Sequence, residues 1–183
     1  MNPIDELTKE HGPVKLMLRI LEKMNEKITG GASIATEDLN NGIGFLKEFA
    51  DKCHHGKEES LLFPAIKENN IPKEVELVDV LTSEHTEGRG YIKNMTEAIK
   101  IKESNPAEFA EIFPDNSQKY IALLDQHIDK ENNDLFPEVR QSLSADQLKE
   151  LEKGFENVEK NIIGEGRHKE LHTMVHQLKE TYL

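Results

Sequence analysis

The chain has 183 residues, 36% of them hydrophobic and 5% aromatic, and its 35 acidic and 23 basic side chains give a formal net charge of −12. This length suits one domain with a core of its own. Because the chain is acidic and lacks a Lys/Arg cluster, we expect no nucleic acid and no membrane among its partners. The single cysteine, Cys53, excludes an internal disulfide and a Cys-x-x-Cys site. No apolar run approaches the roughly 20 residues that span a bilayer, and no signal peptide is recognisable, so we expect a cytoplasmic protein.

A first helix is predicted from Asn2 onwards, because Asn is a preferred N-cap and Pro3 suits the first helical position. Residues spaced three and four apart form one stripe along it: Ile4, Leu7, His11, Val14, Leu18 and Leu21. His11 lies in the middle of this apolar stripe and therefore needs a partner, either a hydrogen bond or a metal. Pro13 is expected to distort the helix locally.

A second helix is predicted after the glycine-containing turn at residues 29–33, with Thr36 as its N-cap. Its apolar stripe continues into His54 and Glu58. These two residues are one helical turn apart, so their side chains point the same way. Pro64 is expected to end or kink this helix.

A third helix is predicted to begin near Lys73, after a connection at residues 68–72, and it carries a lone His85 on its apolar face. Residues 105–106 are expected to start a short helical piece, and Pro114 the fourth main helix. A capping box at Ser144 opens a fifth helix, Gly164-Glu-Gly166 stops it, and one more helical segment follows. The elements predict an all-α protein.

Two copies of one motif organise these helices, at residues 54–64 (HHGKEESLLFP) and 127–137 (HIDKENNDLFP). Aligning the Leu-Phe-Pro ends, which are expected to close their helices, superimposes two pairs: His54 on His127 and Glu58 on Glu131. A Glu-His pair precedes each copy, Glu10-His11 by 43 residues and Glu84-His85 by 42 residues. The duplication predicts a pseudo-two-fold pair of helical hairpins that together hold two cations.

Six residues form the predicted metal site: His11, His54, Glu58, His85, His127 and Glu131. Without partners, burying these imidazoles and carboxylates would be unfavourable by several kcal/mol each, and metal coordination removes that penalty. Mixed nitrogen and oxygen ligands without thiolates favour iron or manganese over structural zinc. We expect one ion on His11 and His54 and the other on His85 and His127. Glu58 and Glu131 are expected to bridge them and to leave positions for water, dioxygen or nitric oxide.

Two further groups of polar residues lie near this pattern. His55 and Glu59 repeat the spacing of the second-helix pair but are rotated by about 100°, and we expect them to face solvent or to support the ligands. A row of histidines one turn apart closes the chain: His168, His172 and His176. These are expected to be partly exposed, with a ligand or supporting role for one of them as the alternative.

The four motifs around His11, His54-x-x-x-Glu58, His85 and His127-x-x-x-Glu131 resemble those of hemerythrin-like proteins of the HHE cation-binding family, over about residues 1–140. The resemblance implies an up-down four-helix bundle around a non-haem di-iron centre at residues 1–142. One or two additional helices at residues 143–183 would pack on it. Oxygen-carrying hemerythrins have His and Asp where this chain has Arg89 and Asn132, so it is more similar to the symmetric bacterial HHE proteins.

The expected function is therefore a non-haem di-iron protein that binds or senses dioxygen or nitric oxide. The alternatives are an enzyme that turns over dioxygen, peroxide or nitric oxide at the same centre, or an iron storage or repair protein. Manganese or zinc can substitute for iron. The sequence identifies no catalytic residues, and it leaves a monomer or a homodimer open, with the C-terminal helices either covering the site or forming a dimer contact.

Overall fold

The computed structural model describes residues 2–69 and 72–183, and within these residues the chain is all-α, with no β-strand. The α-helices are α1 (Pro3–Thr29), α2 (Thr36–Phe45), α3 (Phe63–Glu68), α4 (Pro72–Ile101), α5 (Pro106–Lys130), α6 (Phe136–Ser142), α7 (Ala145–Asn157) and α8 (Arg167–Tyr182). The π-helical segments are η1 (Leu46–His55), η2 (Glu58–Leu62), η3 (Glu131–Leu135) and η4 (Val158–Gly164). The predicted all-α class is confirmed. The predicted connection at residues 68–72 lies partly outside the described residues.

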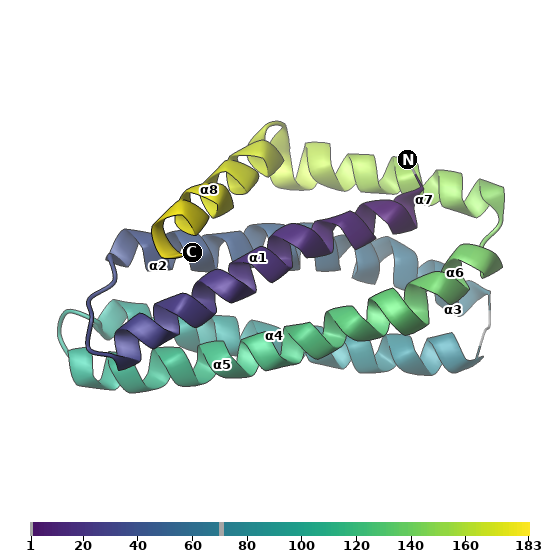
Figure 1. Cartoon of the computed structure of the whole chain (residues 1–183). Helices are drawn as coiled ribbons and strands as arrows, with labels where there is room; N and C mark the ends of the chain where they lie inside the picture. Colours follow the sequence, from purple (N-terminus) through teal and green to yellow (C-terminus); the bar gives the residue numbers. More distant parts are fainter. Residues whose placement is uncertain (1, 70–71) are drawn as a thin grey trace.

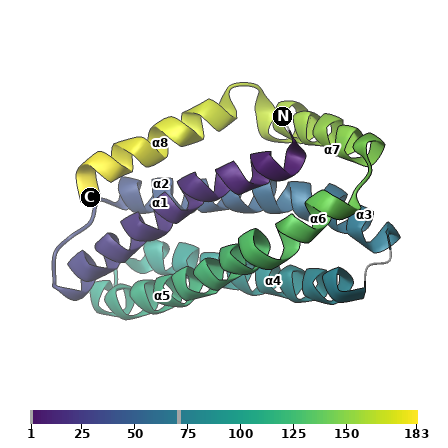
Figure 2. The same ribbon diagram turned by 45° about the vertical axis from the view of Figure 1, so that its right-hand side comes forward.

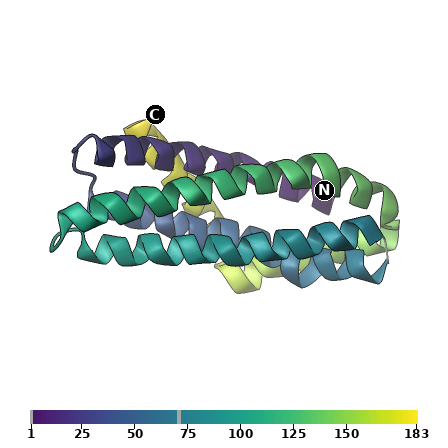
Figure 3. The ribbon, with the colours of Figure 1, turned by 90° about the horizontal axis from the view of Figure 1, so that it is seen from below.

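Four long helical runs form an up-down bundle. They are α1, the run from α2 through η1 and η2 to α3, α4, and the run from α5 through η3 to α6. Figure 1 shows the four runs lying alongside one another with alternating direction. From below, α4 and α5 lie next to each other along their length (Figure 3).

The apolar core of the bundle has two parts, separated by a polar layer. On α1, Ile4 and Leu7 belong to one apolar cluster, and Val14 and Met17 belong to the other. His11 lies between them. On each of the other runs, too, a histidine lies between residues of the two apolar clusters. The apolar stripes that form the core therefore also bring the histidines to one level of the bundle.

Two prolines do not end their helices, although Pro137 was predicted to end one and Pro64 to end or kink one. Pro64 lies in α3, which continues to Glu68, and Pro137 lies in α6, which continues to Ser142. Each proline is preceded by a π-helical segment, η2 or η3. A proline lacks the amide hydrogen and crowds the preceding turn, and the wider π turn accommodates both defects.

Two further prolines lie inside continuous helices, and one of them contradicts a prediction. Residues 106–130 form the single helix α5, with Pro114 inside it, so the prediction of a short helical piece before Pro114 was wrong. Pro13 likewise lies inside a continuous α1. Pro114 is buried, so the packing of its ring against the core compensates for the missing backbone hydrogen bond.

Apart from Pro114, the predicted helix starts are confirmed with one exception. The Asn2 side chain accepts a hydrogen bond from the backbone of Ile4 (2.9 Å), and Ser144 forms the capping box. Thr36 is the first helical residue instead of the N-cap, which is Ala35. Its hydroxyl is 3.5 Å from a carboxylate oxygen of Glu103 and is not used as a cap.

The predicted additional C-terminal helices are present, and they lie along one side of the bundle. A turn with positive φ at Gly164 (107°) and Gly166 (85°) separates η4 from α8 and changes the direction of the chain, so that α8 lies at an angle to α7 (Figures 1 and 2). Helix α8 packs on α1 and α2, and η4 packs on η1 (Figures 1 and 2). The domain boundary at residue 142 stays a prediction. None of the helices in the described parts of the chain has both the length and the apolar character needed to cross a membrane.

Candidate metal centre

Six side chains from all four runs meet in the polar layer between the apolar clusters. They are the six predicted from the repeated motif: His11, His54, Glu58, His85, His127 and Glu131. Each is at most 3% exposed. The structure therefore brings every predicted ligand into one site that solvent hardly reaches.

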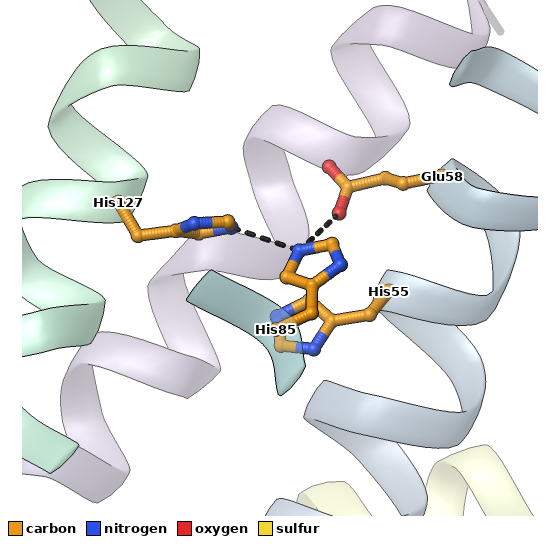
Figure 4. Close-up of side chains that lie close together, drawn as sticks. All are labelled: His55, Glu58, His85 and His127. Atoms are coloured by element: carbon orange, nitrogen blue, oxygen red, sulfur yellow. Dashed lines mark hydrogen bonds and ion pairs between the residues drawn. The ribbon is translucent and has the colours of Figure 1, made fainter. Parts of the chain in front are cut away.

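The four imidazoles face one another through their Nε2 atoms, in two pairs. In the first pair, the Nε2 atoms of His11 and His54 are 3.2 Å apart. In the second, those of His85 and His127 are 3.1 Å apart, as Figure 4 shows. Two nitrogen ligands about 2.1 Å from one metal ion are themselves roughly 3 to 3.4 Å apart, so each pair has the spacing that a single cation requires.

Glu131 lies between the two pairs. Its Oε2 is 3.1 Å from Nε2 of His11, and its Oε1 is 3.1 Å from Nε2 of His127. One carboxylate oxygen thus faces each histidine pair, as in a bridging carboxylate.

Glu58 makes the matching connection on the other side. Its Oε1 is 3.7 Å from Nε2 of His54, and its Oε2 is 3.5 Å from Nε2 of His85. All four carboxylate oxygens of Glu58 and Glu131 are buried without a hydrogen-bond partner among the described residues. Buried oxygens without donors are unfavourable, and cations between the two histidine pairs would satisfy them.

The histidines of the two His-x-x-x-Glu motifs are held from behind by glutamates. Nδ1 of His54 donates to Oε2 of Glu10 (2.9 Å), and Nδ1 of His127 donates to Oε2 of Glu84 (2.9 Å). Glu10 and Glu84 are the acidic members of the repeated Glu-His pairs. In each Glu-His pair the histidine is therefore a ligand candidate, and the glutamate beside it supports a different ligand candidate, the histidine of the following His-x-x-x-Glu motif.

The two upstream histidines are supported by the residue that follows each candidate bridging glutamate. Nδ1 of His85 donates to Oε1 of Glu59 (2.7 Å), and Nδ1 of His11 donates to Oδ1 of Asn132 (2.9 Å). Because all four acceptors are oxygens, the proton of each neutral imidazole is on Nδ1. Its Nε2 lone pair is then free for a cation.

A second ring of contacts holds Glu10. The ammonium of Lys57 is 2.6 Å from Glu10, 2.7 Å from Glu6 and 2.8 Å from Glu159, which is on η4. Lys57 is fully buried. This network keeps Glu10 charged, since the hydrogen bond and charge of His54 together with Lys57 outweigh burial and lower the pKa of Glu10 to about 2.

The second half of the repeat has an equivalent lysine–glutamate contact, but no described residue of the C-terminal extension joins it. Lys130 donates to Oε1 of Glu84, as Lys57 does to Glu10. The Lys130 side chain is 31% exposed. The C-terminal extension therefore encloses only one of two equivalent outer networks.

The repeated Leu-Phe-Pro tails also contribute to the site. Phe63 stacks on His85 with ring centroids 5.9 Å apart, and Phe136 stacks on His11 at 5.6 Å. Each phenylalanine thus covers the lone histidine that its own half does not contain, which fixes the plane of that imidazole.

The charges of the site are coupled. Burial raises the pKa of Glu58 well above its usual range, and the charge of Glu131 adds to this effect. Burial also opposes ionisation of Glu131, but His127 and His11 outweigh it and hold its pKa well below the usual range. Despite burial, Glu131 raises the pKa of His127 to about 9. A cation that enters must therefore compete with the proton of His127, and the raised pKa of Glu58 adds to this competition.

Sequence reasoning located the supporting residues only in part. Glu10 and Glu84 could be recognised as members of the repeated Glu-His pair. Their spacing did not reveal that they support His54 and His127. His55 and Glu59, expected together either at the surface or as support, behave differently. Glu59 supports His85, whereas His55 is 5% exposed and stacks on the His85 ring with centroids 3.8 Å apart.

The C-terminal histidines lie outside the cluster. His168 and His172 are half-buried against Phe49, with ring centroids 5.1 and 5.3 Å away. His168 does lie near Glu10 and Glu159 in an arrangement with metal-ligand spacing. The ammonium of Lys57 already satisfies both of these carboxylates.

Comparison with known proteins agrees with this geometry. The family model described as the hemerythrin HHE cation binding domain matches residues 2–139. Uncharacterized proteins of Mycobacterium bovis and of two strains of Mycobacterium tuberculosis are each 22% identical to the chain over 161 residues. The match covers 88% of this chain and 62% of each relative, so the chain spans about three fifths of their length.

Proposed function

Because the chain belongs to the hemerythrin HHE cation-binding family, we propose that its buried cluster binds two iron ions and that this centre takes up dioxygen or nitric oxide. One ion is assigned to His11 and His54 and the other to His85 and His127. Glu58 and Glu131 are assigned as bridges. The observation that carries this proposal is the set of four buried carboxylate oxygens, without donors in the described chain, between two pairs of Nε2 atoms.

The donor set supports iron. It consists of imidazole nitrogens and carboxylate oxygens, and the one cysteine, Cys53, is buried. Its thiol stays protonated because burial raises its pKa to about 12, so it is not available as a thiolate. Mixed nitrogen and oxygen ligation suits iron or manganese, and zinc accepts it too.

The chain's own residues orient the ligands and keep water away. Hydrogen bonds from the four Nδ1 atoms fix each imidazole and increase the basicity of its Nε2. The apolar clusters on both sides of the polar layer exclude bulk solvent. Iron supplies what protein groups lack, namely a change of oxidation state and coordination positions for a gas.

Gas uptake by reduced, iron-loaded protein tests this function. We expect dioxygen or nitric oxide to bind in proportion to the number of centres, and to be released when the gas is removed. Consumption of many equivalents in the presence of a reductant would instead identify the protein as an enzyme. Rapid loss of iron to a chelator, with no response to either gas, would identify storage or delivery and contradict the proposal.

A further inference from the structure

A small cavity adjoins the metal centre on one side. Its volume is about 10 Å³, which is room for about one water-sized molecule. It is lined by Asp51, His55, Glu84, His85, Gly88, Arg89, Ile92, Tyr120, Leu124 and His127. Both histidines of the second pair belong to this lining, and neither histidine of the first pair does.

Two residue differences between the halves of the repeat account for this asymmetry. Aligning His11 with His85 places Val14 over Gly88, and aligning His54 with His127 places His55 over Ile128. Val14 and Ile128 are buried members of the apolar cluster. Val14 and Ile128 therefore occupy, beside the first histidine pair, the positions that correspond to Gly88 and His55 beside the second pair.

Two residues that line the cavity carry buried polar atoms without a hydrogen bond in the described chain, and the nearest charged group to Nδ1 of His55 that the structure shows is Oδ1 of Asp51, 3.6 Å away. The hydroxyl of Tyr120 and Nδ1 of His55 are both buried, and neither has a hydrogen-bond partner within the described residues. Tyr120 is 1% exposed. Burial raises the pKa of Tyr120, so its hydroxyl keeps its proton and can donate a hydrogen bond. A buried donor without an acceptor is unfavourable unless something in the cavity accepts it.

Two lining residues of the cavity, Arg89 and Asp51, belong to a partly exposed ion-pair network. Arg89 donates to Asp51 (2.7 Å) and to Glu59 (2.7 Å), and the Arg89 side chain is 39% exposed. Glu59 also accepts the hydrogen bond from His85. Glu59 thus connects Arg89 to the ligand candidate His85.

We propose that the exogenous ligand of the centre binds in this cavity, beside His85 and His127, and that the Tyr120 hydroxyl donates a hydrogen bond to it. The ligand class is a small anion or diatomic molecule, of which the cavity has room for about one water-sized end. This inference rests on the proposed function, because the ligand needs an iron centre next to the cavity.

Azide titration of the oxidised, iron-loaded protein, followed by its absorption spectrum, tests the inference. In Tyr120→Phe the ring remains and only the hydroxyl is lost, so we expect about tenfold weaker azide binding with unchanged iron content. Gly88→Ala adds a methyl group whose carbon would lie 3.4 Å from the Tyr120 ring, and it is expected to weaken azide binding as well. Tyr91→Phe is the matched control, because that hydroxyl bonds to Glu87 at the surface.

The outcomes separate the two proposals. Equal azide affinity in wild type, Tyr120→Phe and Gly88→Ala, with iron bound in all three, would overturn the cavity assignment and leave the iron centre intact. Failure of the wild type to bind iron would overturn the proposed function itself. Weaker binding in both cavity variants, with the Tyr91→Phe control unchanged, would establish the cavity as the ligand site.

Discussion

The hydrogen bonds to Nδ1 decide which atom of each imidazole is available to a cation. Glu10 and Glu84 hold the histidines of the two His-x-x-x-Glu motifs, and Glu59 holds His85. His11 has the amide oxygen of Asn132 in place of a carboxylate. This is a local difference between otherwise equivalent halves, and a neutral acceptor makes the imidazole a weaker base than a carboxylate does.

Replacing a supporting glutamate should weaken cation binding without removing a ligand. For Glu10→Gln we expect about 10- to 100-fold lower iron affinity, because a neutral amide replaces the carboxylate that accepts the hydrogen bond from His54. Competition with a chelator measures this affinity. Glu6→Gln is the control, since Glu6 bonds to Lys57 and not to a ligand candidate. Equal losses in both variants would show that the lysine network, and not the support of His54, determines affinity.

Cation uptake should release protons. His127, whose pKa is about 9, holds a proton at pH 7 in the absence of a cation, and the raised pKa of Glu58 favours its protonated form. Binding should therefore release up to about two protons per chain and weaken as the pH falls. Calorimetry in buffers of different ionisation enthalpy measures this number. Heat that is independent of the buffer would contradict these protonation states.

At the residue scale, the convergence of the six ligand candidates could be predicted because each lies on an apolar stripe. A histidine on such a stripe must face the core, and the repeat aligns two pairs of them. The fate of His55 could not be predicted in this way. It lies about 100° away from His54 around the helix, and whether such a position is exposed depends on the neighbouring helix, here the ring of His85.

At the scale of the helices, local sequence signals predicted the caps, whereas tertiary packing decided where the helices continue. Caps at Asn2 and Ser144 follow from side-chain hydrogen bonds close in sequence, and they form as expected. Pro64 was expected to end or kink its helix, Pro137 to end one and Pro114 to start one, and all three lie within continuous helical runs. Sequence patterns of this kind do not reveal a π turn, whose stability depends on the neighbouring helices.

Lys57 joins three elements of the fold, and its removal should be costly. In Lys57→Met the carboxylates of Glu6, Glu10 and Glu159 lose their common partner, so we expect the free energy of unfolding to fall by roughly 3–5 kcal/mol. The equivalent Lys130→Met removes a partly exposed ammonium, and roughly 1 kcal/mol or less is expected. Urea denaturation of both metal-free variants measures the difference. Equal effects would mean that η4 does not bury the Lys57 network.

The whole molecule is a symmetric bundle with an asymmetric cover. The repeat creates two equivalent outer networks, and the C-terminal helices enclose only the one around Lys57. The cavity lies on the other half. The additional helices could be predicted from their capping box and apolar stripes, but the side on which they pack could not, because that depends on surface complementarity.

The C-terminal extension should unfold together with the bundle. Phe155 of α7 is fully buried in the apolar cluster that also contains Ile4 and Leu62. In Phe155→Ala we expect a loss of roughly 3–5 kcal/mol, seen as one cooperative transition at lower urea concentration by circular dichroism. A separate early transition, with the main one unchanged, would show that the extension is an independent unit.

Iron content per chain, measured together with the optical spectrum of oxidised protein, tests the central claim most directly. The wild type should bind two iron ions and show an absorption band of a bridged ferric pair. In Glu58→Ala, which removes a bridge but none of the histidines, that band should collapse. Wild-type protein that stays folded, takes up no iron anaerobically and gains no spectrum would contradict the account.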